Sequence, residues 1–194
     1  MCSLSKDLVL FIHFDKDVNP DLPSYTAQVA QIDAAFSAYG SSRILGVTVG
    51  NEYILNAPSR GDTIANATAW LISRITDYKT HLQSKSISLP VGTSDAAGTY
   101  LGSVAPSTDY LFVNIHPWFS DNTYEQAAWF SSTYMTNIIQ PMVNTTWPSQ
   151  INGKTPRQLF QGEFGWPSAS DSAALGVNAA GSPAGITEMQ QVLE

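Results

Sequence analysis

The sequence has few charged residues and no run of basic side chains. Asp, Glu, Lys and Arg together make up 13% of the 194 residues, against about 25% in an average globular protein. The 16 acidic residues outnumber the 9 basic ones, so the formal net charge is −7. A negative chain without a basic patch is not expected to bind a phosphate backbone, which argues against a nucleic-acid partner. With 43% apolar residues, a disordered, charge-solvated chain is excluded as well.

Paired cysteines and long hydrophobic runs are also missing. Cys2 is the single cysteine, so no internal disulfide can form and the redox compartment stays undecided. No stretch reaches the roughly 18 apolar residues of a membrane span. The apolar run 8–12 is bounded by Asp7 and His13, and no small-residue cleavage site follows it. This pattern favours a buried strand over a signal peptide, and no signal peptide is visible in this chain.

Apolar runs of strand length alternate with stretches of helical spacing. The expected strands are 8–14, 44–49, 88–93, 110–115 and 158–161. The expected helices are 25–39, 63–83, 96–104, 123–143 and 186–193. Asp62 is expected to cap the second helix, and Asp95 is expected to cap the third rather than contact a ligand. The small-residue segment 169–185 is expected to be an irregular loop. Strand–helix alternation of this kind predicts an α/β fold with a parallel sheet.

Such a sheet has two possible closures. An open doubly wound sheet often carries a Gly-x-Gly-x-x-Gly or Gly-x-x-x-x-Gly-Lys-Ser/Thr phosphate loop, and the sequence has neither. The alternative is a (β/α)8 barrel of the TIM type, which takes eight βα units and about 250 residues. The sequence contains about five units. We therefore expect residues 1–194 to form a single, partial βα-barrel domain.

Two glutamates come directly after, or at the end of, an apolar strand. Glu52 closes the segment Val-Gly-Asn-Glu at 49–52, and Glu163 lies in Gly-Glu-Phe-Gly-Trp-Pro-Ser at 162–168. The carboxyl ends of the strands form the active face of a βα-barrel, so both carboxylates would face one pocket. Paired carboxylates are the minimum set for glycoside hydrolysis, because one protonates the leaving oxygen and the other attacks the anomeric carbon or activates water. For either glutamate alone, a surface position in a loop is the alternative.

Other chemistries find less support. His13, His81 and His116 are scattered and show no metal-ligand spacing. No Gly-x-Ser-x-Gly segment indicates a serine hydrolase. We therefore expect neither a metal ion nor a cofactor.

Three segments carry a family resemblance. Segments 49–52 and 162–168, with Asn-Ile-His-Pro-Trp-Phe at 114–119 between them, resemble signature segments of glycoside hydrolase family 17, in its fungal branch. The resemblance runs from about residue 8 to the end of the chain. That family contains β-1,3-glucan endohydrolases and cell-wall glucanosyltransferases on a (β/α)8 barrel. Its Asn-Glu segment ends the fourth strand and its Gly-Glu strand is the seventh, so by this register the first two βα units and the eighth strand are missing here.

The resemblance implies roles for seven residues. Glu52 would be the general acid/base and Glu163 the nucleophile of a retaining mechanism, with carboxyl groups about 5–5.5 Å apart. Asn51 would bind the 2-hydroxyl of the sugar being cleaved, or cap the turn after its strand. His116 would orient the nucleophile, or be a buried structural histidine. The side chains expected as flat walls under pyranose rings are Trp118, Phe119 and Trp166.

Two hypotheses for the function follow from this resemblance. The first is a retaining glycoside hydrolase that cleaves β-1,3-glucan or transfers its fragments to another glucan chain. The second is an inactive fragment that at most binds glucan. A third possibility is an incomplete gene model of a longer secreted enzyme. In each case the expected partner is β-1,3-glucan, the chain is expected to be monomeric, and the resemblance implies a secreted or cell-wall location.

Overall fold

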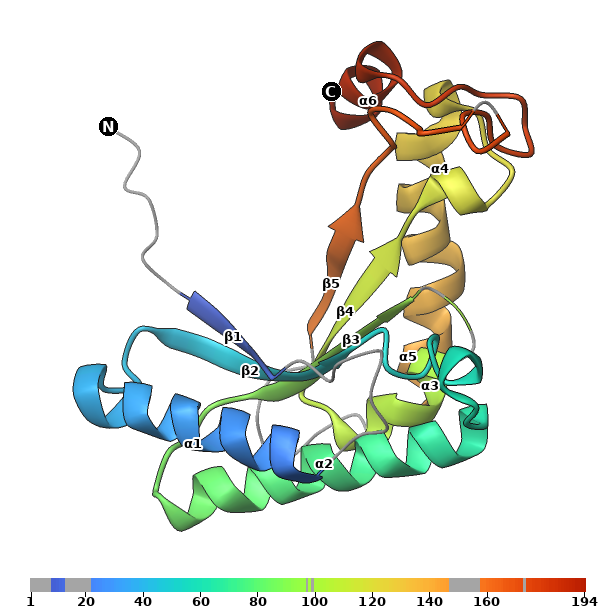
Figure 1. Cartoon of the computed structure of the whole chain (residues 1–194). Helices are drawn as coiled ribbons and strands as arrows, with labels where there is room; N and C mark the ends of the chain where they lie inside the picture. The colour runs from blue at the N-terminus through green and yellow to red at the C-terminus, as the bar shows by residue number, and fades with distance from the viewer. Residues whose placement is uncertain (1–7, 13–21, 97, 99, 147–157, 173) are drawn as a thin grey trace.

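Figure 1 shows the computed structural model of the chain, in which one curved sheet has helices packed along one of its faces. The structure describes residues 8–12, 22–96, 98, 100–146, 158–172 and 174–194. Its five strands are β1 (Leu8–Ile12), β2 (Ile44–Asn51), β3 (Val91–Ala96), β4 (Tyr110–Ile115) and β5 (Gln158–Phe164). Every neighbouring pair is parallel, and the strand order β1-β2-β3-β4-β5 follows the chain.

This strand order identifies the architecture. A doubly wound sheet reverses its strand order at a switch point, whereas each strand in the described part of this sheet is added on the same side as the one before. Right-handed crossovers that always proceed in one direction place all their helices on one face and curl the sheet towards a barrel. The prediction of consecutive units of a (β/α)8 barrel is confirmed.

The helices lie in the connections between the strands and after β5. They are α1 (Leu22–Tyr39), α2 (Ile64–Ser84), α3 (Tyr100–Val104), α4 (Ala127–Tyr134), α5 (Gln140–Thr146) and α6 (Ile186–Leu193). The expected helix 123–143 is divided, since a π-helical turn at Met135–Ile139 joins α4 to α5. None of the described helices is long and apolar enough to cross a membrane.

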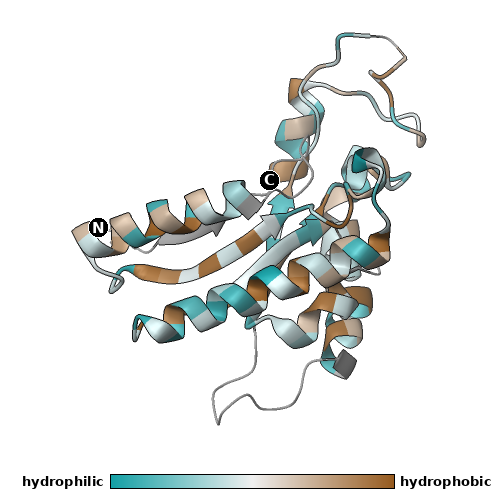
Figure 2. Cartoon of the chain, turned by 60° about the horizontal axis from the view of Figure 1, so that its bottom comes forward, coloured by the Kyte–Doolittle hydropathy of each residue, from teal (hydrophilic) through white to brown (hydrophobic). Residues whose placement is uncertain are grey.

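Helix α2 shows how the sequence builds the main core. Its buried residues recur every three or four positions, at Ala67, Leu71, Ile75, Tyr78 and Leu82. This spacing gives the helix one apolar face, and Figure 2 shows apolar and polar residues alternating along the helices in front of the sheet. The apolar face packs against strand residues that are fully buried: Val47, Val49, Val91, Leu111 and Val113.

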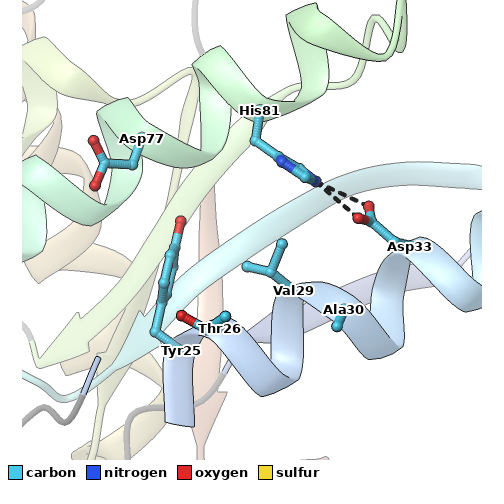
Figure 3. Close-up of a pocket in the computed structure, with 7 residues that line it drawn as sticks. All are labelled: Tyr25, Thr26, Val29, Ala30, Asp33, Asp77 and His81. Atoms are coloured by element: carbon cyan, nitrogen blue, oxygen red, sulfur yellow. Dashed lines mark hydrogen bonds and ion pairs between the residues drawn. The ribbon is translucent and has the colours of Figure 1, made fainter. Parts of the chain in front are cut away.

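Polar contacts join α1 to α2 on this helical side. Figure 3 shows His81 of α2 reaching Asp33 of α1, with Nε2 lying 2.9 Å from Oδ1. The Tyr25 hydroxyl donates to the carbonyl of Arg74 at 3.2 Å. Tyr25, Asp33 and His81 also line a hollow between the two helices, and none of the predicted site residues lines it.

The opposite face of the sheet carries an aromatic cluster. The ring centre of Phe112 lies 5.4 Å from that of Tyr110 and 5.5 Å from that of Phe160. The Tyr110 hydroxyl shares a 2.7 Å hydrogen bond with the Thr48 hydroxyl. A Cβ atom at Gly92 would collide with the Tyr110 ring. Since strand residues alternate between faces, Phe112 and Asn114 of β4 share this inner side of the sheet.

Some predicted boundaries and caps were wrong. Strand β3 starts at Val91 instead of residue 88, because Pro90 has no N–H for a sheet hydrogen bond. The cap of α2 is Thr63 instead of Asp62, since the Thr63 side chain accepts from the Asn66 N–H at 3.1 Å. Asp95 caps no helix and lies inside β3. The irregular segment 169–185 is confirmed over the residues the structure describes.

Candidate active site

The two glutamates meet at the carboxyl end of the sheet. Glu52 directly follows β2, and Glu163 is the second-last residue of β5. One oxygen of each carboxylate and one ring nitrogen of His116 all lie within 4.8 Å of one another. The His116 Nε2 atom lies 3.1 Å from Glu163 Oε2, within hydrogen-bond distance of this carboxylate. The sequence places Glu52 and Glu163 more than a hundred residues apart, and the parallel sheet brings them together.

A one-residue shift in strand register turns each functional segment towards the inner face. On β2, Thr48 pairs with Gly92 while Asn51 pairs with Ser94, so β2 holds one extra residue. On β5, Gln161 pairs with Val113 while Glu163 pairs with Asn114, which again leaves one extra residue. A bulge of this kind re-aims the side chain that follows it. Without it, strict alternation would point Asn51 and Glu163 towards the helices.

A glycine lies at each shift for a different physical reason. Gly50 has φ of 84°, a conformation that glycine adopts without steric cost. At Gly162 the limit is space, because a Cβ atom would lie 2.7 Å from Asn114 Oδ1 and 2.8 Å from Phe112 Cβ. Gly50 directly precedes Asn51 and Gly162 directly precedes Glu163, so the two glycines shape the strand ends at candidate site residues.

A continuous hydrogen-bond network connects the two carboxylates. The Ser94 hydroxyl donates to Asn114 Oδ1 at 2.9 Å. The Asn114 amide donates to Asn51 Oδ1 at 3.1 Å and to Glu52 Oε1 at 3.3 Å. Asn51 in turn donates to Glu163 Oε1 at 3.2 Å. Because Ser94 and Asn114 are almost fully buried, the network is fixed to the sheet from beneath and open to solvent at Glu163.

Glu52 holds an unusual backbone conformation. Its φ is 50°, in the left-handed region that costs a non-glycine residue about 1–3 kcal/mol. The turn is held by hydrogen bonds from the Glu52 N–H to the Ser94 carbonyl at 3.0 Å and from the Asn56 N–H to the Glu52 carbonyl at 3.0 Å. The Arg60 guanidinium adds a 2.7 Å bond to the Tyr53 carbonyl.

Asp95 anchors the same turn from the helical side of β3. Its side chain is fully buried, and its carboxylate accepts from the N–H groups of Ile54 and Leu55 at 2.9 and 3.3 Å and from that of Ala96 at 2.8 Å. Burial raises the pKa of Asp95 to about 6, the three N–H donors oppose this shift, and the negative charge of Glu52 adds to it.

This raised pKa predicts a pH-dependent contribution to stability. An acid whose pKa is higher in the folded state than its ordinary value of 3.8 stabilises the fold when it is protonated, and this contribution is lost as the pH rises through about 6. From about pH 7 to pH 4, the unfolding free energy of the wild type should gain up to about 3 kcal/mol relative to Asp95→Asn. Urea unfolding at both pH values measures this difference. Asp171→Asn, at an exposed carboxylate, is the control and should follow the wild type; a pH-independent difference between wild type and Asp95→Asn would contradict the prediction.

The three aromatic side chains that are expected to lie under the sugar rings differ in their exposed fraction. Phe119 is 81% exposed and its ring centre lies 6.3 Å from that of His116, so its face is available beside the carboxylates. Trp166 is 5% exposed, and its N–H donates to the Pro183 carbonyl at 2.9 Å. Trp166 thus exposes little of its ring to solvent, and the sugar contact expected of it stays a prediction. Trp118 is half-buried and meets Trp166 edge-on at 5.1 Å.

Sequence reasoning missed three residues of this site. Asn114 is the first residue of the segment 114–119. Its position at the end of a strand, close to His116, is a pattern from which it could have been predicted. Ser94 lies in the strand between the two motif strands, and only the register of the sheet reveals its contact with Asn114. Asp95 was expected to cap a helix, whereas the structure uses it to anchor the Glu52 turn.

Comparison with known proteins agrees with the fold and the motifs. The family model of the BtgE/BtgC glycoside hydrolase domain matches residues 4–192. The btgC protein of Aspergillus niger is 31% identical over 162 residues, which are 81% of this chain and 22% of that protein. The glucan endo-1,3-beta-glucosidase btgC of Emericella nidulans is 26% identical over 153 residues, or 76% of this chain and 22% of that protein. The chain thus spans about a fifth of the length of these relatives.

Solved structures show the same fold at lower identity. An active-site mutant of the Rhizomucor miehei β-1,3-glucanosyltransferase in complex with laminaritriose gives a TM-score of 0.63 at 20% identity, covering 91% of this chain and 56% of that one. An endo-laminarinase from Formosa gives a TM-score of 0.61 at 13% identity, covering 87% and 49%. A glycoside hydrolase family 17 β-1,3-glucanosyltransferase structure from Rhizomucor miehei shares the fold with a TM-score of 0.60 at 21% identity. With a family match over nearly all its residues, the chain belongs to the BtgE/BtgC glycoside hydrolase domain family.

Proposed function

We propose that the chain carries the catalytic carboxylates of a retaining glycoside hydrolase that acts on β-1,3-glucan. The observation that carries the proposal is the close approach of Glu52 and Glu163, with oxygens within 4.8 Å of each other. Inverting enzymes hold their carboxyl groups about 6.5–9.5 Å apart to admit a water molecule, whereas retaining enzymes use about 5–5.5 Å. The short separation therefore favours direct attack by one carboxylate. The btgC relative is a glucan endo-1,3-beta-glucosidase and the structural neighbour is a β-1,3-glucanosyltransferase, which supports a β-1,3-glucan substrate.

The proposed reaction takes two displacements. In the first, Glu163 attacks the anomeric carbon, the glycosidic C–O bond breaks, and Glu52 gives its proton to the leaving oxygen. In the second, Glu52 takes a proton from the incoming hydroxyl, whose oxygen displaces Glu163 from the sugar. Water as acceptor gives hydrolysis, and a hydroxyl of another glucan chain gives transfer. In this proposal Asn51, which donates to Glu163 in the free site, binds the 2-hydroxyl of the sugar instead.

We further propose that residues 1–194 act as one partial barrel domain and that the enzyme works outside the cell or in the cell wall. The family match over residues 4–192 supports the first of these statements. The second depends on the substrate, because β-1,3-glucan is a cell-wall polymer.

The experiment that tests this function is incubation of the purified chain with laminarin. We expect release of oligosaccharides, analysed by chromatography, and we expect the release to persist in EDTA because both displacements use carboxylates alone. Glu125→Gln, at an exposed carboxylate outside the site, is the matched control and should retain activity. Glucan binding without any released product would contradict catalysis by this chain.

A second candidate function is glucan binding without turnover. The exposed Phe119 ring offers an apolar surface for a sugar whether or not the reaction proceeds. Affinity electrophoresis in laminarin distinguishes the candidates when it is read beside the product assay.

Gly162→Ala should lower activity while the protein stays folded. The new methyl group would lie 2.7 Å from Asn114 Oδ1, so Asn114 must move away from Glu52 or β5 must shift with Glu163. A displacement near 1 Å costs about 10²-fold in rate, and overpacking costs about 1–3 kcal/mol of stability. Gly165→Ala is the matched control, because a Cβ atom there meets nothing within 4 Å. Equal activities of the two variants would show that the packing at Gly162 does not matter.

A further inference from the structure

Asp95 is a buried carboxylate that the proposed chemistry does not use. It extends from β3 towards the helical side, opposite to Ser94, whose hydroxyl joins the network around the glutamates. Its three hydrogen-bond donors are backbone N–H groups, two of them in the turn that follows Glu52. Asp95 therefore touches neither the inner face nor a substrate bound there.

The turn that Asp95 holds begins at Glu52, whose backbone conformation is unusual. Glu52 has φ of 50°, and a conformation of this kind persists only where the surrounding structure fixes it. Two bonds to the Asp95 carboxylate fix Ile54 and Leu55, two and three residues after Glu52. On the other side of Glu52, Asn51 is held in the sheet by its pairing with Ser94. The turn is thus fastened to β3 on both sides of Glu52 through neighbouring residues.

We infer that Asp95 is a positioning residue for the reaction, which holds the Glu52 carboxyl group at its working distance from Glu163 by anchoring the turn 52–55 to β3. The catalytic consequence rests on the proposed function, while the anchoring itself does not. The charged group that acts on Asp95 is Glu52, and the other groups facing it are the N–H donors of Ile54, Leu55 and Ala96.

Asp109 provides a matched control. Its carboxylate also accepts a backbone N–H, from Val91 at 2.9 Å, and pairs with Lys79 at 2.9 Å. It lies just before β4 and contacts the first residue of β3, at the end of the sheet away from the glutamates. Asp109→Asn and Asp95→Asn each remove one structural carboxylate that bonds to the backbone, and only the second lies beside Glu52.

The first measurement needs no activity. In nuclear magnetic resonance spectra of the wild type, the amide signals of Ile54, Leu55 and Ala96 should shift together with one midpoint near pH 6. Asp95→Asn should abolish that shared transition and move the side-chain amide signal of Asn114, which donates to Glu52. Asp109→Asn should do neither. Separate midpoints, or an Asn114 signal that is unchanged in Asp95→Asn, would overturn the anchoring.

The second measurement compares turnover of laminari-oligosaccharides. A displacement of Glu52 without loss of a substrate contact should lower kcat about 10–100-fold and change KM less than about threefold. Asp109→Asn should keep kcat within about threefold of the wild type. Equal losses of kcat in both variants, or no loss in Asp95→Asn, would overturn the positioning role. A wild type that lacks turnover but shows the shared transition would contradict the proposed function and leave the anchoring supported.

Discussion

Glu163→Gln should lose essentially all turnover of β-1,3-glucan, with kcat reduced by at least about 10³-fold. The amide is a poor nucleophile, so the bond to the anomeric carbon cannot form. The substitution keeps the shape of the side chain. It also retains an oxygen that can accept the hydrogen bond from the Asn51 amide, whose nitrogen lies 3.2 Å from Glu163 Oε1 in the wild type. Binding of laminari-oligosaccharides should therefore stay close to that of the wild type. Initial rates and calorimetric binding check the two parts of this prediction.

The control for this substitution is Glu125→Gln, the same chemical change at an exposed glutamate in the turn before α4. It should leave kcat within about twofold, as expected for a surface substitution away from the site. Thermal unfolding of both variants separates loss of chemistry from loss of the fold. Substantial turnover by a folded Glu163→Gln protein would mean that another group is the nucleophile.

Glu52→Gln should lower turnover of β-1,3-glucan about 10²–10⁴-fold. The sugar leaving group is a poor one and needs a proton from Glu52. An aryl β-glucoside whose phenolate leaves without protonation avoids this requirement in the first displacement. The variant should therefore release phenolate in a burst and then stall, because no base activates water for the second displacement.

Azide offers a direct test of this variant. It attacks the anomeric carbon without deprotonation, so added azide should restore turnover of Glu52→Gln and yield a β-glycosyl azide. The same azide should have no effect on Glu163→Gln, in which no intermediate forms. Restoration in Glu163→Gln with a β-azide product would instead exchange the roles of the two glutamates, because a β-azide forms only where the nucleophile is intact.

The sequence predicted the fold class because its signals are local and repeated. Strands β1, β2 and β4 are largely apolar runs, and β4 and α6 have the predicted bounds. Predicted element boundaries were wrong where a single residue determines them, as Pro90 does before β3 and Thr63 does before α2. The helix expected to begin at residue 96 failed since Asp95 and Ala96 still belong to β3.

The two carboxylates of the candidate site could be predicted from the sequence, whereas most of the residues that support them could not. Glu52, Glu163 and His116 stand in recognisable segments, and a parallel sheet must bring the ends of those segments to one edge. Register shifts at Gly50 and Gly162 depend on pairing between strands that are distant in the sequence, which no local pattern records. The hydrogen bond of Trp166 to the Pro183 carbonyl joins segments that are apart in the sequence, so the burial of this ring could not be predicted from local pattern.

The central claim is that Glu163 forms a covalent bond with the sugar while Glu52 transfers protons. Trapping with a 2-fluoro-laminaribioside that carries an activated leaving group tests it most directly, because the fluorine slows the second displacement. Mass spectrometry of the digested protein should find one added glycosyl group on the peptide that contains Glu163, and none in Glu163→Gln. A glycosyl group on any other residue, or turnover with inversion at the anomeric carbon and no adduct, would contradict the two-displacement mechanism.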